Sequence, residues 1–389
     1  MAVAILLDTN AASVPIYRYL VDAGHDVHVV GDKPDNALAK SADNYIKLDY
    51  SNVEAVTALV ERLDADFLIP GCNDLSYETC AAISATRRFP GIDPVETVRI
   101  LGNKQDFRQY AEAVGIPAPR QISEADARSA GAVIVKPADA YSGRGITALM
   151  APSAADLAAA INQAKAFSRS GSCLIEEFVQ GQLYSHSAFL GPDGIVTDFF
   201  VEEYGSVNPY AVDTSYVVPA FDPALANGVR AAIEKIARDL NLTAGLIHTQ
   251  FIVDGDKFWI IEITRRCPGD LYSQLIASST GFNYAENYTR PFLGEGFDGR
   301  DQAYRPVLRH TISVRTPQIF EGLQFRRAAD IEMFVPLALT GEHIAASPFG
   351  RIGILFARAD DAAALNTLLH TALNGELYAV LGQDRKTRS

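Results

Sequence analysis

Two oxygen-bearing side chains, Gln250 and Glu262, stand within two neighbouring apolar runs and could bind one cation between them. The runs, 246–253 and 258–263, are rich in β-branched and aromatic residues and flank a turn sequence, which predicts a β-hairpin. Strand side chains alternate faces, so the two groups share a face if paired residue numbers have an even sum. A two-residue turn at Asp254-Gly255 would give an odd sum, so we expect a longer turn. Amide and carboxylate oxygens suit Mg2+.

The alternative is a surface hairpin with a solvated polar face, and the hairpin alone does not decide between the two. The residues next to Gln250 and Glu262 indicate which ligand the site could bind. Arg265 and Arg266 follow the second run directly, which suits a site that receives phosphate groups. His248 shares a face with Gln250, and Thr264 shares a face with Glu262. The pattern therefore predicts a magnesium and phosphate site on one side of the hairpin.

Two lysines and a glycine-rich segment upstream could bind phosphate as well. Lys104 lies in the first turn of a helix predicted over 101–114, where a positive charge is unfavourable to the helix dipole. Either a specific contact holds it, or it is solvated. Lys136 ends a short apolar strand, 132–135, and the segment 138–146 (ADAYSGRGI) follows. Its glycines would let backbone N–H groups approach a phosphate. The GxxxxGK[ST] pattern is absent, so the segment is not a P-loop, and a plain hairpin turn is the alternative.

Composition excludes several classes of protein. The 389 residues are 48% apolar and 21% charged, which is ordinary for a globular chain of two or three domains. A net charge of −13 argues against a nucleic-acid-binding surface and an anionic membrane surface. No apolar run reaches the about 18 residues of a membrane span. The first residues lack the features of a signal peptide. We expect a cytoplasmic protein.

The four cysteines are Cys72, Cys80, Cys173 and Cys267. They are scattered, and none has zinc-ligand spacing. We expect free thiols in a reducing compartment. Cys267 lies beside the predicted site, and we expect a small buried residue there rather than a nucleophile.

The N-terminal third alternates strands with helices. Strands are predicted over 2–7, 26–30 and 67–70, and this order predicts a parallel sheet with helices on both faces. The first strand-to-helix turn has no GxGxxG pattern, so a dinucleotide role is poorly supported. Asn73 and Asp74 follow the third of these strands, at the sheet edge where ligands bind, but a helix N-cap explains them equally well.

Further along, the strand predicted over 173–179 carries two adjacent acids, Glu176 and Glu177, on opposite faces. We expect 184–190 to pair with it after Gly181. One acid should face solvent, and the other could meet a ligand.

The polar segment 203–217 is either a lid or substrate loop or a simple connector. The last third, from residue 301, mixes strands at 307–314 and 352–356 with a helix at 361–373. No internal repeat or low-complexity segment is present.

These features, taken in order, resemble the ATP-grasp superfamily over roughly 101–294. The likeness is to its carbamoyl-phosphate synthetase and biotin-carboxylase-like branch and to single-chain amino-acid ligases. The residues that carry it are Lys104 before Gly-Ile-Pro-Ala-Pro, Val-Lys136-Pro with its glycine-rich loop, Glu176-Glu177-Phe178-Val179, then Gln250, Glu262 and Arg266, and Ser-Thr-Gly281.

The resemblance implies an α/β and α+β chain in three parts. A parallel-sheet domain that precedes the ATP-grasp domain would span 1–100. A two-lobed ATP-grasp domain would span 101–300, with the glycine-loop subdomain at about 120–182. A small α+β segment would span 301–389.

The resemblance also implies roles for individual residues. Phosphate contacts would come from Lys104, Lys136 and the loop residues Ser142, Gly143, Arg144 and Gly145. The adenine-binding linker would be Glu176, Glu177, Phe178 and Val179. Metal ligands would be Gln250, Glu262 and Thr264. Arg266 and Lys136 would act in catalysis.

Two departures from the family pattern put parts of this assignment in doubt. Thr264 stands where the family usually has Asn, and would ligate more weakly or through water. Leu183 or Ser185 stands near the place of a ribose-binding acid. Asp270 resembles a position near the acceptor substrate, and a role for Arg309 is not readable from the sequence.

The expected activity is ATP-dependent joining of a small-molecule carboxylate to an amine, with ATP and Mg2+ as cofactors and Mn2+ as a substitute. An acyl phosphate would form, and ADP and phosphate would be released. Bicarbonate activation and a nucleotide-binding scaffold without catalysis are the alternatives. The resemblance leaves a homodimer open, and no nucleic acid or membrane partner is expected.

Overall fold

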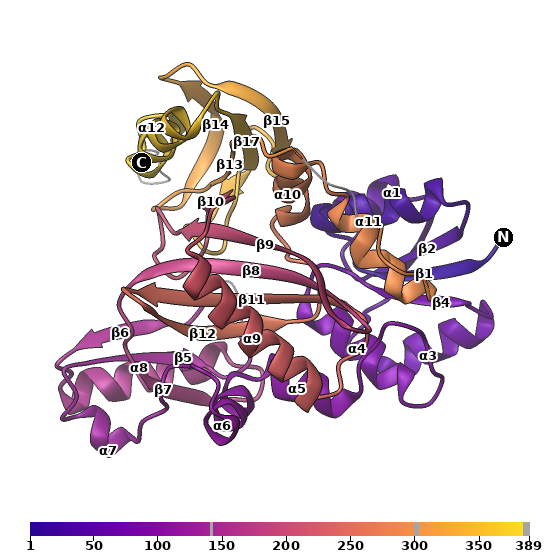
Figure 1. Ribbon diagram of the computed structural model, residues 1–389. Coiled ribbons are helices and arrows are strands. Elements are labelled where there is room, and N and C mark those ends of the chain that lie inside the picture. Colours follow the sequence, from indigo (N-terminus) through magenta and orange to yellow (C-terminus); the bar gives the residue numbers. More distant parts are fainter. Residues whose placement is uncertain (141–142, 299–302, 384–389) are drawn as a thin grey trace.

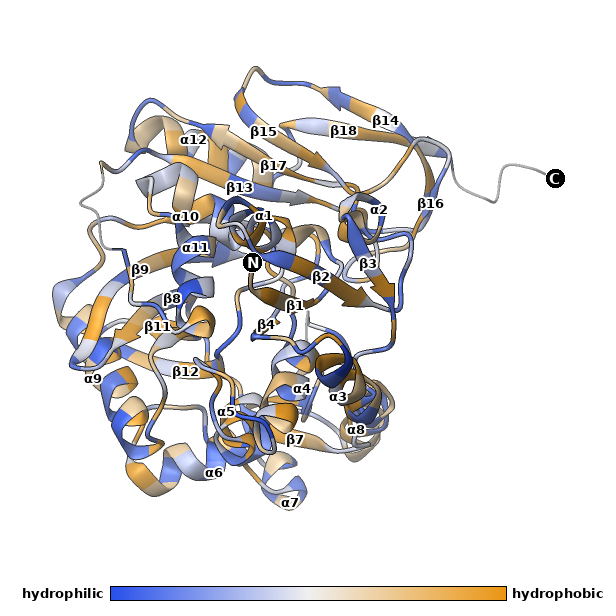
Figure 2. Ribbon diagram, turned by 90° about the vertical axis from the view of Figure 1, so that its right-hand side faces the viewer, coloured by the Kyte–Doolittle hydropathy of each residue, from blue (hydrophilic) through white to orange (hydrophobic). Residues whose placement is uncertain are grey.

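The computed structural model describes residues 1–140, 143–298 and 303–383. A parallel four-stranded sheet, in the order β3-β2-β1-β4, forms the N-terminal part. Strands β1 and β2 are largely apolar in Figure 2 and are mostly buried, because helices cover them, whereas the edge strand β3 is more exposed. The elements are β1 (Val3–Leu7), η1 (Ala11–Ser13), α1 (Val14–Asp22), β2 (Asp26–Gly31), α2 (Ala37–Ser41), β3 (Asn44–Lys47), α3 (Val53–Arg62), β4 (Phe67–Pro70), α4 (Asp74–Ser84) and α5 (Val95–Gly102).

A small antiparallel sheet, in the order β6-β5-β7, follows in the chain. It is the lower lobe in Figure 1. Helix α8 begins with a capping box at Ser153 and Asp156 and buries Leu157, Ala160 and Ala164 against this sheet. The elements are α6 (Lys104–Val114), α7 (Glu124–Ala127), β5 (Ala132–Pro137), β6 (Thr147–Met150), α8 (Ala154–Phe167) and β7 (Cys173–Glu177).

The central sheet has eight strands in the order β12-β11-β8-β9-β10-β13-β17-β15. Strand β10 pairs with both β9 and β13, so the C-terminal strands continue this sheet. The elements are β8 (Gln182–Gly191), β9 (Gly194–Tyr204), β10 (Thr214–Val217), α9 (Pro223–Asp239), β11 (Gly245–Asp254), β12 (Lys257–Thr264), α10 (Tyr272–Thr280), α11 (Tyr284–Thr289), η2 (Arg290–Leu293), β13 (Val307–Ile312), β15 (Asp330–Pro336), β17 (Gly353–Arg358) and α12 (Ala362–Leu373).

A third antiparallel sheet, β16-β14-β18, packs beside these C-terminal strands. Its elements are β14 (Gln318–Phe325), β16 (His343–Ile344) and β18 (Tyr378–Gln383). The sequence analysis did not predict these strands, nor β15.

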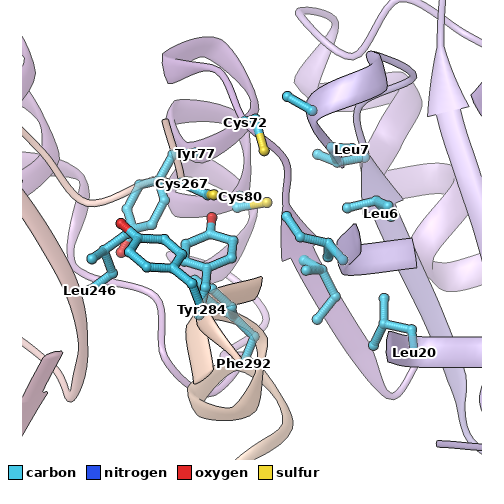
Figure 3. Close-up of a cluster of buried hydrophobic side chains, with 14 of the residues drawn as sticks. Leu6, Leu7, Leu20, Cys72, Tyr77, Cys80, Leu246, Cys267, Tyr284 and Phe292 are labelled. Atoms are coloured by element: carbon cyan, nitrogen blue, oxygen red, sulfur yellow. The ribbon is translucent and has the colours of Figure 1, made fainter. Parts of the chain in front are cut away.

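Two cores hold the central sheet in place. Helix α9 lies across one face in Figure 1, and its Val229, Ile233 and Ile236 pack with Phe251 and Ile260 of the hairpin. On the other face, α10 and α11 lie between the central sheet and the N-terminal sheet. Figure 3 shows Tyr77, Cys267, Tyr284 and Phe292 from this second core near Leu6 and Leu7 of β1. The N-terminal sheet and the central sheet therefore share one continuous core.

The hairpin β11–β12 differs from the sequence-based expectation in its turn. Asp254 pairs with Lys257, so the turn has the two residues Gly255 and Asp256 and gives an odd sum, and the prediction of a longer turn was wrong. A β-bulge restores the even sum, because Phe251 pairs with Ile260 and Gln250 with Glu262. Ile261 is the extra residue. Gln250 and Glu262 thus lie opposite each other, as predicted, for a reason other than the one predicted.

The predicted pairing of 173–179 with 184–190 was also wrong. Strand β7 pairs with β5, and β8 pairs with β9 and β11. The residues between them, 178–181, cross from the small sheet to the central sheet.

No helix in the described part of the chain is long and apolar enough to cross a membrane.

Gly181 gives a test of how tightly this crossing is packed. Its φ is +151°, and a Cβ atom there would lie 2.2 Å from the carbonyl oxygen of Val253. We expect Gly181→Ala to lower the free energy of unfolding by about 2–4 kcal/mol in urea unfolding, from backbone strain plus the clash. Gly171→Ala is the matched control. Gly171 has φ +68°, and no atom of the described residues lies within 4 Å of a Cβ built there, so it should lose only about 1–2 kcal/mol. Equal losses would contradict the packing argument.

Candidate active site

Gln250 and Glu262 face each other across β11 and β12 near the end of the hairpin that adjoins the N-terminal part. The bulge at Ile261 allows this, because it lets Ile260 and Ile263 both enter the core while Glu262 points away from it. The Glu262 side chain is 36% exposed, so its carboxylate is open to a ligand.

Lys104 reaches Glu262 from helix α6. The predicted helix over 101–114 is two helices, because α5 ends at Gly102 and Asn103 begins a new one. The Asn103 side chain accepts the backbone N–H groups of Gln105 and Asp106, which makes Lys104 the first helical residue. Its Nζ donates to the carbonyl oxygen of Ala140 at 2.8 Å and lies 3.3 Å from Glu262 Oε1. Lys104 is therefore held by specific contacts and links the glycine-rich loop to the hairpin.

Lys136 belongs to a fully buried ion network. Its Nζ lies 2.7 Å from Glu176 Oε2, and Arg108 Nε donates to Glu176 Oε1 at 2.5 Å. Arg108 also donates to the carbonyl oxygen of Ile261, the bulged residue, at 2.8 Å. Burial lowers the pKa of Lys136, and Glu176 opposes that effect. Burial would raise the pKa of Glu176, but Lys136 and Arg108 hold it below its ordinary value. The network joins β5, β7, α6 and β12.

Arg266 is held by an acid from the N-terminal part. Its Nε and Nη2 donate to the two carboxylate oxygens of Asp74, at 3.0 and 3.1 Å, and Thr264 Oγ1 donates to the same group at 3.1 Å. Burial would raise the pKa of Asp74, but Arg266 keeps it below its ordinary value. Asn73 is the N-cap of α4, since its side chain accepts the N–H of Ser76. Of the two open alternatives, Asn73 is thus the cap and Asp74 reaches the site.

Arg265 does not reach the site, contrary to the expectation that both arginines would serve phosphate. Its side chain is buried, with Nε donating to Asp93 at 2.6 Å and Nη1 to the carbonyl oxygen of Leu246 at 2.5 Å. It instead anchors the end of the hairpin to the segment before α5. Adjacent residues on a strand face opposite ways, so only Arg266 shares the face of Glu262.

The glycine-rich loop and the linker lie at the edges of the site. Gly143 and Gly145 have φ of +68° and +69°, and a Cβ on Gly143 would lie 2.2 Å from the carbonyl oxygen of Tyr210. The segment 205–213 therefore touches this loop. Arg144 stacks on Phe349, with its guanidinium carbon 5.2 Å from the ring centre. Ser142, a predicted phosphate contact, lies outside the described residues.

The four residues of the predicted linker have different environments. Glu176 is fully buried in the ion network, so it is a structural ion-pair partner. Glu177 accepts the backbone N–H of Arg120 at 2.9 Å and is 39% exposed. Phe178 and Val179 enter the crossing between the two sheets, and their adenine-binding role stays a prediction.

The site has a buried acidic end, of which the sequence analysis named Asp270 but gave Glu203 no individual role. Glu203, on β9, is 3% exposed and accepts a hydrogen bond of 2.6 Å from Gln250 Nε2. Burial, with Asp270 nearby, raises the pKa of Glu203 to about 7. Arg309 is fully buried, forms an ion pair with Asp270, and donates to Ser215 at 2.8 Å. The polar segment predicted over 203–217 begins inside a strand, because β9 continues through Tyr204. The apolar run Phe199–Val201, directly before Glu202 and Glu203, was the available signal.

His248 lies on the same face as Gln250 but is neutral. Burial lowers its pKa to about 3, and Arg266 adds to this effect. Its Nδ1 shares a hydrogen bond of 2.8 Å with Ser187 Oγ. A ring with this pKa is a weak proton acceptor at neutral pH, which argues against a role of His248 as a general base.

Comparison with known proteins bears on this arrangement. The family model described as the ATP-grasp domain matches residues 130–274. Residues 130–274 carry an ATP-grasp domain. The carbamoyl phosphate synthase large chain of Acidobacterium capsulatum is 24% identical over 213 residues. That match covers 51% of this chain and 19% of the relative, so the chain spans only a small part of it.

Solved structures with the same fold include three enzymes. L-amino acid ligase from Bacillus licheniformis has a TM-score of 0.79 at 15% identity, covering 99% of both chains. Phosphoribosylglycinamide synthetase from Anaerococcus prevotii has 0.74 at 16%, covering 98% of this chain and 100% of that one. Biotin carboxylase from Campylobacter jejuni, in a complex with β,γ-ATP, has 0.72 at 17%, covering 97% and 92%.

The donor set of the ATP-grasp site fits magnesium. Among the described residues, no group of three or more His, Cys, Asp or Glu side chains could hold a metal by itself. Mg2+ usually takes one or two protein carboxylates and completes its shell with water and phosphate. Gln250 and Glu262 would supply two oxygens to such an ion, and Mn2+ takes similar ligands. The Thr264 hydroxyl donates to Asp74, and its place as a third ligand stays a prediction.

The buried network makes a prediction about stability. Glu176→Gln leaves two buried cations, Lys136 and Arg108, without their counter-charge. We expect the free energy of unfolding in urea to fall by about 3–5 kcal/mol. Glu177→Gln is the matched control, because its half-exposed side chain keeps an oxygen that accepts the Arg120 N–H. It should lose less than about 1 kcal/mol. Similar losses for both variants would contradict the network.

Proposed function

We propose that the protein is an ATP-dependent carboxylate–amine ligase that works through an acyl phosphate and releases ADP and phosphate. The observation that carries the proposal is the meeting of Lys104, Gln250 and Glu262. There a candidate phosphate-binding cation from helix α6 meets two metal-type oxygen ligands, one from each strand of the hairpin β11–β12. Phosphoryl transfer needs positioning and neutralisation of charge more than covalent help from the protein.

The residues of the chain would divide the work as follows. Lys104, Lys136 and Arg266 would bind phosphate oxygens, with Lys104 already fixed against the glycine-rich loop. Gln250 and Glu262 would hold Mg2+, which supplies charge neutralisation between the phosphates. The loop residues Gly143 to Gly145 would cover the nucleotide and keep water out.

The acidic end of the site would receive the two substrates. Among the described residues, Arg309 Nη2 and Asp270 Oδ1 are buried and have no hydrogen-bond partner. A guanidinium donor suits the carboxylate of one substrate, and a carboxylate acceptor suits the amine of the other. The neutral His248 would orient rather than take the proton from the amine.

The choice of acid substrate has one alternative. The relative from Acidobacterium capsulatum is a carbamoyl phosphate synthase, and one solved structure with the same fold is a biotin carboxylase domain in complex with MgADP and bicarbonate. We therefore keep bicarbonate as the alternative to an organic carboxylate. The division of the chain into units at 1–100, 101–300 and 301–389 is likewise a proposal. The last boundary lies within one sheet, because β10 and β13 pair across it.

A screen of ADP release tests this function. We expect phosphate and ADP to form from ATP and Mg2+ only when a carboxylate and an amine from a small-molecule library are both present. Release that depends on bicarbonate alone would favour the alternative. ATP binding without turnover under every condition would contradict the proposal.

Glu262→Ala tests the site within the same assay. Removing this ligand should lower the rate by about a hundredfold or more, because the phosphate charge is no longer neutralised. Asp256→Ala removes an exposed carboxylate from the turn of the same hairpin and should leave the rate unchanged. Both variants should still unfold in one cooperative transition, so that a lost rate is not a lost fold. Near-normal turnover by Glu262→Ala would remove the metal assignment.

A further inference from the structure

The amide of Gln250 must be oriented before it can serve a cation. Only its oxygen is a ligand, and the NH2 group would repel the ion. The described contacts of Gln250 fix this choice, because Nε2 donates to Glu203 Oε2 at 2.6 Å. The oxygen is then left for the side where Glu262 stands.

Glu203 reaches Gln250 across an intervening strand. In the sheet order β11-β8-β9, Ser185 of β8 pairs with Gln250, and Glu203 lies two strands away on β9. The serine side chain is small and turns its hydroxyl to Tyr272 at 3.2 Å. It therefore leaves room for the direct bond between the amide and the carboxylate.

Burying the carboxyl group of Glu203 at this position costs free energy, so a role in packing alone does not explain it. Glu203 is 3% exposed and lies near a second acid, Asp270, which raises the free energy of its charged form. Its hydrogen-bond partner is a candidate metal ligand. Outer residues that orient a ligand typically change metal affinity by about 10- to 100-fold when removed.

We infer that Glu203 is a positioning residue for the metal site, an inference that rests on the proposed function. It holds the Gln250 amide with Oε1 toward the cation. When ionised, its carboxylate also adds negative charge next to the neutral Gln250, beside the charge of Glu262. In this pair, Gln250 would supply the oxygen that binds the metal, and Glu203 would supply the negative charge.

An exchange of the two side chains tests this inference. Glu203→Gln and Gln250→Glu, combined, preserve the hydrogen bond with donor and acceptor reversed, and still present an oxygen to the metal. The readout is the affinity for Mn2+ in the presence of a non-hydrolysable ATP analogue, from the electron paramagnetic resonance signal of free Mn2+.

Each single variant should bind Mn2+ more weakly, and the double variant should recover. Glu203→Gln removes the charge and the fixed orientation, so we expect a loss of about 10- to 100-fold. Gln250→Glu sets two carboxylates against each other, and the affinity should fall by a similar factor. The double variant should return to within about threefold of the wild type, because contacting residues are not additive.

Glu202→Gln is the matched control. Glu202 is the neighbour of Glu203 on β9, and its carboxylate accepts the hydroxyl groups of Tyr204 and Tyr216 on the other face of the sheet. Its Mn2+ affinity should equal that of the wild type. If Glu203→Gln does not fold, Glu203→Asp keeps the charge but withdraws it from the amide, and should still weaken Mn2+ binding by about tenfold.

The outcomes separate this inference from the proposed function. Wild-type protein that binds no Mn2+ with the nucleotide analogue overturns both. Wild-type binding with an unchanged Glu203→Gln affinity overturns the positioning role alone. Losses that add in the double variant, without recovery, show that Glu203 only supports the fold and also overturn the role.

Discussion

The buried carboxylate of Glu176 is the constraint on which the site depends. It binds both Lys136 and Arg108, and Arg108 also donates a hydrogen bond to the carbonyl oxygen of Ile261. A bulged residue leaves backbone groups outside the strand ladder, and a buried carbonyl without a donor is costly. Arg108 therefore satisfies the bulge that turns Glu262 toward the ligand side. One network fixes a predicted phosphate-binding lysine and the geometry of the hairpin together.

Ion pairs of this kind recur where parts of the chain distant in sequence meet around the site. Asp74 from the N-terminal sheet holds Arg266, Lys104 from α6 contacts Glu262, and Asp270 pairs with Arg309 from the C-terminal strands. Each pair neutralises a charge that would otherwise be buried alone. The same cations are the groups expected to meet phosphate and carboxylate. Bound substrates would then compete with, or add to, these internal partners.

The sequence predicted the elements that have strong local signals. The strand at 67–70 has the predicted bounds, and the helix predicted over 361–373 begins one residue later, since periodicity and flanking polar residues mark them. Pairings between strands were harder. The bulge at Ile261 has no local signature, and the order of β7 and β8 depends on contacts far along the chain. The role of Glu203 was not predicted, because it depends on the contact with Gln250 and on the nearby Asp270. Both residues are far from Glu203 in the sequence, so a local pattern does not bring them together.

The pairing of β10 with β13 has a consequence for how the protein can be divided. A fragment that stops at residue 300 would lack β13, so the backbone of β10 would become an unprotected sheet margin open to self-association. The same cut would remove Arg309 and leave Asp270 without its partner. Expression of the ATP-grasp region in isolation would thus yield an aggregation-prone piece rather than a minimal enzyme. Any duplication or transplantation of this unit would have to carry the last strands with it.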